Sequence, residues 1–147
     1  MQPFLLMRSM HSARTRSSAP STGLRVAVVG LEPSSKDPAG LGELVSALLG
    51  AGHAPVVVPL RRTLELEAPV ELTLAEGPSL VVVVLHDPWI APRLLAFVRL
   101  LRQREYRGHV SAAGVLATSL RLEFLNRHRD FDSVIWRSPE VTVVELA

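Results

Sequence analysis

Three short runs of the chain are apolar at almost every position, and they limit the folds that this sequence can adopt. Residues 24–29 read Leu-Arg-Val-Ala-Val-Val, residues 55–60 read Pro-Val-Val-Val-Pro-Leu, and residues 80–85 read Leu-Val-Val-Val-Val-Leu. A strand with one face in water alternates between apolar and polar residues, whereas a strand covered on both faces is apolar throughout. We therefore predict strands covered on both faces, as in a parallel sheet between layers of helices.

Segments with helical character separate these strands. After the first strand, apolar residues recur at helical spacing and glycines then end the helix: Leu41, Leu44, Val45, Leu48 and Leu49, followed by Gly50 and Gly52. Residues 64–67 alternate like an edge strand, but we favour a short helix from Pro69 to Glu76. Further helices are predicted at residues 92–104, at residues 119–127 and from Pro139 onward, and further strands at residues 109–113 and 133–136. This alternation predicts a five-stranded, doubly wound parallel sheet of flavodoxin-like type, with strand order 2-1-3-4-5.

The chain divides into a short basic start and one domain. With 147 residues it is long enough for a single core and too short for a second one. Residues 1–23 contain Arg8, Arg14 and Arg16 with many serines, and the first acid is Glu32. We predict a disordered tail over 1–23 and the α/β domain over 24–147, although a transit peptide or a start codon placed ahead of Met7 or Met10 has the same composition.

Composition excludes several classes of protein. The absence of cysteine excludes disulfides, thiolate metal sites and a cysteine nucleophile, and it fits a cytoplasmic protein. No apolar run approaches the roughly 18 residues that cross a bilayer, so we expect a soluble chain. The net charge is only +2, and the arginines near residue 100 fall off the apolar face of a predicted helix, so we expect a solvated surface rather than nucleic-acid binding: Arg93, Arg99, Arg102, Arg104 and Arg107.

The loops that follow the predicted strands lack the common catalytic motifs. Four of them meet at the ligand edge of such a sheet, at residues 30–40, 86–90, 114–118 and 137–142. Neither G-x-G-x-x-G nor G-x-x-x-x-G-K-[ST] occurs, and a phospho-receiver site would lack both its acidic pair and its lysine. His86 and Asp87 are the only adjacent histidine and carboxylate in these loops, and a zinc site needs three or four ligands. We therefore do not expect an enzyme on its own.

Several segments together resemble the cobalamin-binding domain found at the amino end of many radical-SAM enzymes. Residues 40–56 are similar to its first helix, which ends in Ala-Gly-His before the second strand. Residues 113–118, Ala-Gly-Val-Leu-Ala-Thr, are similar to its Gly-Gly-x-His-x-Thr turn. Residues 131–135 and 139–146 are similar to its closing strand and to the start of its last helix. This resemblance covers the chain from Leu24 to its end.

The resemblance implies a corrinoid ring across the carboxyl ends of the strands, with its nucleotide tail beside the sheet. It implies contacts from each of the four loops, carried over position by position to the following residues: Pro33, Ser34, His86, Gly114, Thr118, Glu140 and Thr142. It implies no protein ligand to cobalt, because the Asp-x-His-x-x-Gly motif of the other cobalamin class is absent. It also implies a partner, a radical-SAM or methyltransferase subunit, because the chain has no cysteines for an iron–sulfur cluster.

Some positions depart from this pattern and leave a second hypothesis open. Ala113 and Leu116 replace a glycine and a histidine, and Arg137 and Ser138 replace Gly-Glu. The first hypothesis is a stand-alone carrier that supplies cobalamin to a separate enzyme. The second is a degenerate domain without cofactor that serves as an interaction or stabilising subunit, with Trp89 and Leu116 as apolar contacts.

Overall fold

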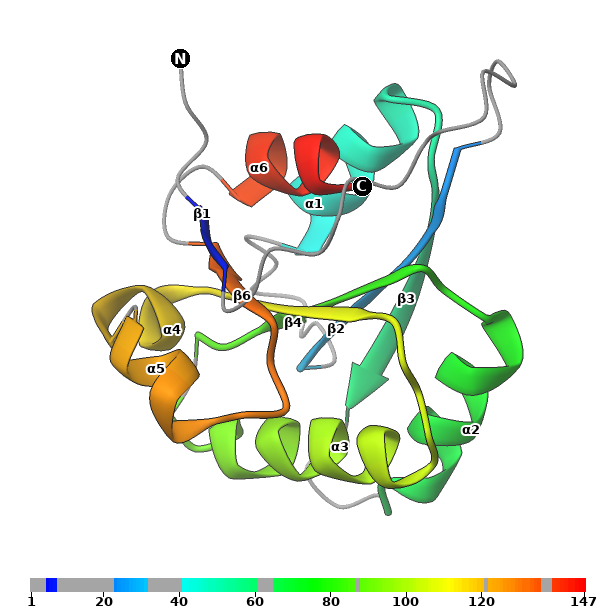
Figure 1. Cartoon of the computed structure of the whole chain (residues 1–147). Coiled ribbons are helices and arrows are strands. Elements are labelled where there is room, and N and C mark those ends of the chain that lie inside the picture. Colours follow the sequence, from blue (N-terminus) through cyan, green and yellow to red (C-terminus); the bar gives the residue numbers. More distant parts are fainter. Residues whose placement is uncertain are drawn as a thin grey trace.

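The computed structural model describes residues 5–7, 23–31, 41–60, 65–86, 88–120, 122–135 and 139–147. Within these ranges, the backbone alone is described for residues 5–7, 31, 139–141 and 143. The described elements form a central sheet with a layer of helices on each side (Figure 1).

Each of the five predicted strands corresponds to a parallel strand of the sheet. They are β2 (Arg25–Leu31), β3 (Ala54–Leu60), β4 (Leu80–Val84), β5 (His109–Ala113) and β6 (Ser133–Ile135). Their spatial order is β3-β2-β4-β5-β6, which confirms the predicted order 2-1-3-4-5. All five residues of β4 are buried, as expected for a central strand covered on both faces.

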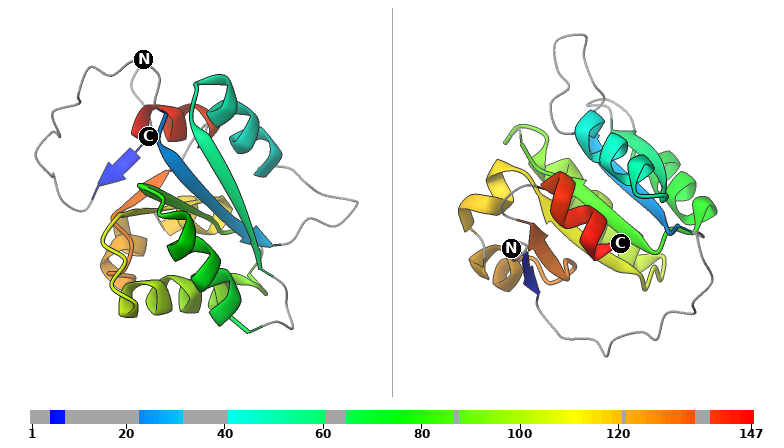
Figure 2. Two further views of the ribbon diagram at one scale, coloured as in Figure 1. Left: turned by 90° about the vertical axis from the view of Figure 1, so that its right-hand side faces the viewer. Right: turned by 90° about the horizontal axis from the view of Figure 1, so that it is seen from above.

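Helices cover the two faces of the sheet unequally. α1 (Leu41–Gly50) and α6 (Pro139–Leu146) lie side by side on one face (Figures 1 and 2). The other face carries α2 (Glu67–Glu76), α3 (Ala91–Gln103), α4 (Val115–Leu120) and α5 (Leu122–Arg127). Because successive residues of a strand point to opposite faces, β2, β4, β5 and β6 contribute to both cores, whereas β3, at the edge of the sheet, contributes to the core beneath α3.

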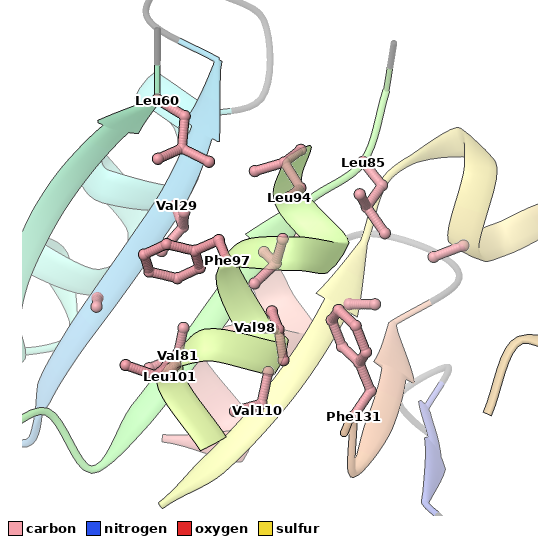
Figure 3. Packing of buried hydrophobic residues seen from close by; sticks show 14 of the residues in the cluster. Val29, Leu60, Val81, Leu85, Leu94, Phe97, Val98, Leu101, Val110 and Phe131 are labelled. Carbon is pink, nitrogen blue, oxygen red and sulfur yellow. The ribbon is translucent and has the colours of Figure 1, made fainter. Parts of the chain in front are cut away.

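The larger core lies beneath α3. The predicted apolar face of α3 is confirmed. Four buried side chains of this helix point toward the sheet (Figure 3): Leu94, Phe97, Val98 and Leu101. The smaller core, beneath α1 and α6, contains Leu44 and Leu48 with the alternate residues Val26 and Val28 of β2.

Two features differ from the sequence-based expectation. The predicted helix over residues 119–127 is two helices, and α4 already begins at Val115, so Thr118 lies in a helix and not in a loop. Within the segment predicted to be disordered, Leu5–Met7 forms a strand, β1, that pairs antiparallel with β6 and adds a sixth strand to the sheet. Such pairing satisfies main-chain groups at the edge of β6, and three residues carry no periodic pattern that would reveal it.

Candidate functional site

The candidate site is the edge of the sheet at which the parallel strands end, here called the carboxyl edge. β2 and β4 are neighbours, and the chain continues from β2 to β3 on one side and from β4 to β5 on the other, so the strand order reverses between them. Ligands of doubly wound folds bind at such a reversal. Residues 32–40 after β2 and 136–138 after β6 lie outside the described residues, so the described part of this edge consists of the segments after β4 and β5.

A one-residue turn at Gly114 joins β5 to α4. Its φ of +101° lies in the left-handed region, which side chains rarely adopt. A Cβ at this position would lie 2.6 Å from the carbonyl oxygen of Leu85 and 2.9 Å from its nitrogen. Glycine therefore permits both the turn and the close approach of the two chain segments.

Backbone hydrogen bonds fix the segment after β4 to this turn. The N–H of Leu85 donates to the carbonyl oxygen of Ala113 at 2.7 Å, and the N–H of Leu116 donates to the carbonyl oxygen of Leu85 at 3.0 Å. Further along, the N–H of Val115 donates to Nδ1 of His86 at 3.4 Å. His86, Gly114 and the start of α4 are thereby held together.

Two apolar side chains at this edge are exposed to solvent. Trp89, in the turn before α3, is 82% exposed, and Val115, the first residue of α4, is 60% exposed. Trp89 was expected here from the sequence, but Val115 was not. Its only sequence signal is its position directly after Gly114.

Near the turn after β5, two residues depart from the cobalamin-binding pattern, Ala113 and Leu116, and both pack in the core. Ala113 is fully buried with Val84 and Ile135 on the α1 and α6 side of the sheet. Leu116 is half-buried and packs against the core on the opposite side. The Ala113 methyl group therefore does not project from the carboxyl edge, and Leu116 is not among its exposed apolar side chains.

The remaining predicted contacts are dispersed. Pro33 and Ser34 lie outside the described residues. Thr118 stands one turn into α4, where its N–H donates to the carbonyl oxygen of Gly114 at 2.9 Å. Glu140 lies in the first turn of α6, where only the backbone is described, and Thr142 is 1% exposed in the same helix. His86, Gly114 and Thr118 form one cluster, and Thr142 is buried within the layer formed by α6.

The described residues offer little acid–base or metal chemistry at this edge. Among them, no group of three or more histidine, aspartate or glutamate side chains is placed to hold a metal ion. The groups whose pKa is shifted lie at the opposite end of the strands, the amino edge. Burial raises the pKa of Tyr106 to about 12, and the hydrogen bonds that Arg104 donates to the carboxylates of Glu71 and Glu67 raise the pKa of Arg104. Burial, followed by the charges of Arg127 and Arg99, lowers the pKa of His128.

The ligand that the sequence resemblance implies for this edge is a corrinoid. A corrinoid holds its cobalt in a ring, so the protein must supply a surface for that ring and hydrogen bonds for its side-chain amides. At the described carboxyl edge, Trp89 and Val115 supply exposed apolar area and His86 supplies an exposed polar group. No described helix is long and apolar enough to cross a bilayer.

Comparison with known proteins shows likeness to solved structures and no likeness in sequence. No family model matches the chain, and no curated protein matches it. In structure it is similar to a chain of the methanol:cobalamin methyltransferase complex MtaBC from Methanosarcina barkeri, with a TM-score of 0.56 and 11% sequence identity. The match covers 83% of this chain and 47% of the other, so the chain spans about half the length of its structural neighbour. At this identity the likeness shows a shared fold: the chain has the doubly wound α/β architecture found in that complex.

Proposed function

We propose that this chain is a cobalamin-binding-like domain that carries a corrinoid and presents it to a separate enzyme, a radical-SAM or methyltransferase subunit. The observation that carries the proposal is the described carboxyl edge. There, the apolar side chains of Trp89 and Val115 are exposed to solvent, and so is the polar side chain of His86. A flat, largely apolar ring with polar substituents matches that combination. When bound, a corrinoid would supply methyl transfer or redox chemistry at its cobalt.

The structural neighbour supports this proposal. It belongs to a methanol:cobalamin methyltransferase complex, which joins cobalamin chemistry to an assembly of subunits.

The proposed contacts have different parts in the site. The turn after β5 is Gly114, and hydrogen bonds connect it and the start of α4 to His86 and Thr118. We propose that these three residues face the ring. Pro33, Ser34 and Glu140 are proposed from the resemblance alone. Thr142 is buried, so we propose that it supports α6 beneath the ligand and does not touch the exposed ring face.

A second candidate is an interaction subunit without a cofactor. The same exposed side chains favour it, because Trp89 and Val115 would bury apolar area against a protein partner as well as against a ring. The two candidates differ in whether the purified chain alone holds a corrinoid.

Gel filtration of the protein after incubation with hydroxocobalamin tests the carrier proposal. We expect corrin absorbance to co-elute with the wild-type chain. Val115→Glu, which places a charge on the exposed edge, should remove that absorbance without unfolding the protein. The control is Leu49→Glu, because Leu49 is equally exposed at 61% but lies at the far end of α1. A folded wild-type chain that elutes without corrin absorbance would refute the carrier role.

The same pair of variants tests the interaction subunit. If the wild-type chain excludes hydroxocobalamin, the second candidate predicts a stoichiometric protein complex that Val115→Glu disrupts and Leu49→Glu preserves. A complex that both variants retain would refute this use of the carboxyl edge.

A further inference from the structure

The segment that carries His86 is fixed by backbone bonds. Leu85, the preceding residue, is 1% exposed and is bonded through both its N–H and its carbonyl group to the turn after β5. His86 itself is exposed. Its ring therefore projects from a fixed backbone position at the carboxyl edge and is not part of the core.

The hydrogen bond to the ring determines which ring nitrogen carries the proton. The N–H of Val115 lies 3.4 Å from Nδ1 of His86. A backbone N–H can only donate, so Nδ1 must present its lone pair, and the proton of the neutral ring resides on Nε2. Since the two nitrogens occupy different sides of the ring, the Nε2–H bond points away from α4.

We propose that Val115 holds His86 in the Nε2–H tautomer, so that His86 donates a hydrogen bond to the corrinoid and does not coordinate its cobalt. This inference rests on the proposed function. Coordination through Nε2 would need a lone pair there and a proton on Nδ1, which would then face the N–H of Val115 with two donors in opposition. Coordination through Nδ1 would break the existing hydrogen bond.

The group that His86 would bind is an acceptor oxygen. A corrinoid offers two kinds, the carbonyl oxygens of the ring amides and the phosphate oxygens of the nucleotide tail. Cobinamide retains the amides but lacks the tail and its phosphate. A comparison of cobalamin with cobinamide therefore separates the two sources.

Long-range proton–nitrogen NMR of the ligand-free, ¹⁵N-labelled protein measures the tautomer directly. We expect the His86 signals of an unprotonated Nδ1 and a protonated Nε2. A proton on Nδ1 would overturn the inference, whether or not a corrinoid binds.

Paramagnetic resonance of cob(II)alamin bound to the ¹⁵N-labelled protein tests coordination. Cobalamin with nitrogen at natural abundance carries ¹⁴N, so a histidine ligand from the protein would split the signal into doublets and a ligand from the nucleotide tail into triplets. We expect no ¹⁵N doublet. Binding with a doublet overturns this inference alone, whereas the absence of any binding overturns the proposed function and this inference with it.

Substitution of His86 tests the donated bond. His86→Leu should weaken binding about two- to tenfold, the effect of one hydrogen bond, and His86→Gln, which retains an N–H donor, should recover most of it. A loss for cobalamin alone indicates the phosphate, and an equal loss for cobinamide indicates a ring amide. The control is His128→Gln at the amino edge, and unchanged binding of both corrinoids by His86→Leu would contradict the proposal.

Discussion

Gly114 is the residue on which the shape of the carboxyl edge depends most. Its φ of +101° and its contact with the backbone of Leu85 both exclude a side chain. We expect Gly114→Ala to lower the free energy of unfolding by about 2 kcal/mol or more, because it adds backbone strain and a collision with atoms that cannot rotate away. Urea denaturation measures this change.

A second glycine in the chain provides the matched control. Gly42 lies in α1, is exposed, and has no atom within 4 Å of where a Cβ would stand. Gly42→Ala should raise the free energy of unfolding by about 0.5–1 kcal/mol, because alanine restricts the unfolded chain and favours helix. Equal effects of the two substitutions would contradict the role assigned to Gly114.

Arg102 joins the loops at the amino edge. Its guanidinium group donates to four oxygen atoms at 2.7 to 3.0 Å, three of them backbone carbonyl oxygens and one a carboxylate oxygen: Asp130 O, Tyr106 O, Gly108 O and Asp132 Oδ2. The side chains of Arg102 and Asp132 are 21% and 29% exposed, so water screens this ion pair only in part.

Loss of this guanidinium group should destabilise the protein. We expect Arg102→Met to lower the free energy of unfolding by about 2 kcal/mol or more, because several partly buried oxygens lose their donor. Arg127→Met is the control, since the pair of Arg127 with Glu123 is 60% and 56% exposed and should contribute within about 0.5 kcal/mol. If urea denaturation showed that Arg102→Met lowers the free energy of unfolding no more than the small loss expected for Arg127→Met, Arg102 would not have this structural role.

His128 makes the stability depend on pH. Its ring packs on Phe124 with the ring centroids 4.6 Å apart, and its pKa lies below the ordinary value of 6.5. Between the lowered pKa and 6.5 the unfolded chain binds more protons than the folded one, so this residue destabilises the fold as pH falls below about 6.5. Replacement by phenylalanine, which keeps the ring packing but does not titrate, should reduce the fall in Tm between pH 7.5 and 5.5. An unchanged pH dependence would exclude His128 as a cause.

At the scale of the elements, apolar periodicity predicts the parallel strands and most helices because the sheet is covered on both faces. The start of α4 escaped prediction, since no Ser, Thr, Asp or Asn precedes Val115 and the turn depends on the contact of Gly114 with Leu85. β1 was not predicted because it is only three residues long and its pairing with β6 is a tertiary contact. Local patterns report local structure, and both misses concern contacts between distant segments.

β3 protects its outer edge with prolines. The N–H of Ala54 donates to the carbonyl oxygen of Leu24, the residue before β2, so alternate residues from Ala54 onward face β2 and the residues between them face outward. The outward positions are Pro55, Val57 and Pro59. Of these only Val57 has an N–H, so the edge offers few donors to another strand.

Removal of the prolines should allow this edge to pair with a strand of another molecule. We expect the double variant Pro55→Thr with Pro59→Thr to show a higher weight-average mass than the wild-type chain in sedimentation experiments, because it gains two outward N–H donors. Val57→Thr changes the same side of the strand without adding a donor and should leave the mass unchanged. An unaltered mass for the double variant would refute the protective role of the prolines.

At the scale of the whole molecule, the two ends of the sheet are built differently. The amino edge is joined by side-chain interactions, those of Arg102 and those of Arg104 with Glu67 and Glu71. The described carboxyl edge is joined by backbone hydrogen bonds around Gly114 and leaves Trp89 and Val115 exposed. The sequence predicts a site at this edge because topology alone brings the strand ends together, but the burial of Thr142, in contrast to the exposure of His86, depends on packing.

Nuclear magnetic resonance of the ¹⁵N-labelled chain, titrated with hydroxocobalamin, tests the central claim most directly because it reports both binding and its location. The account predicts saturable shifts of the backbone amide signals of His86, Gly114 and Val115, with those of Gly77, Gly108 and Arg129 at the amino edge unchanged. Amide signals that stay unchanged at the carboxyl edge, or that move only at the amino edge, would contradict it.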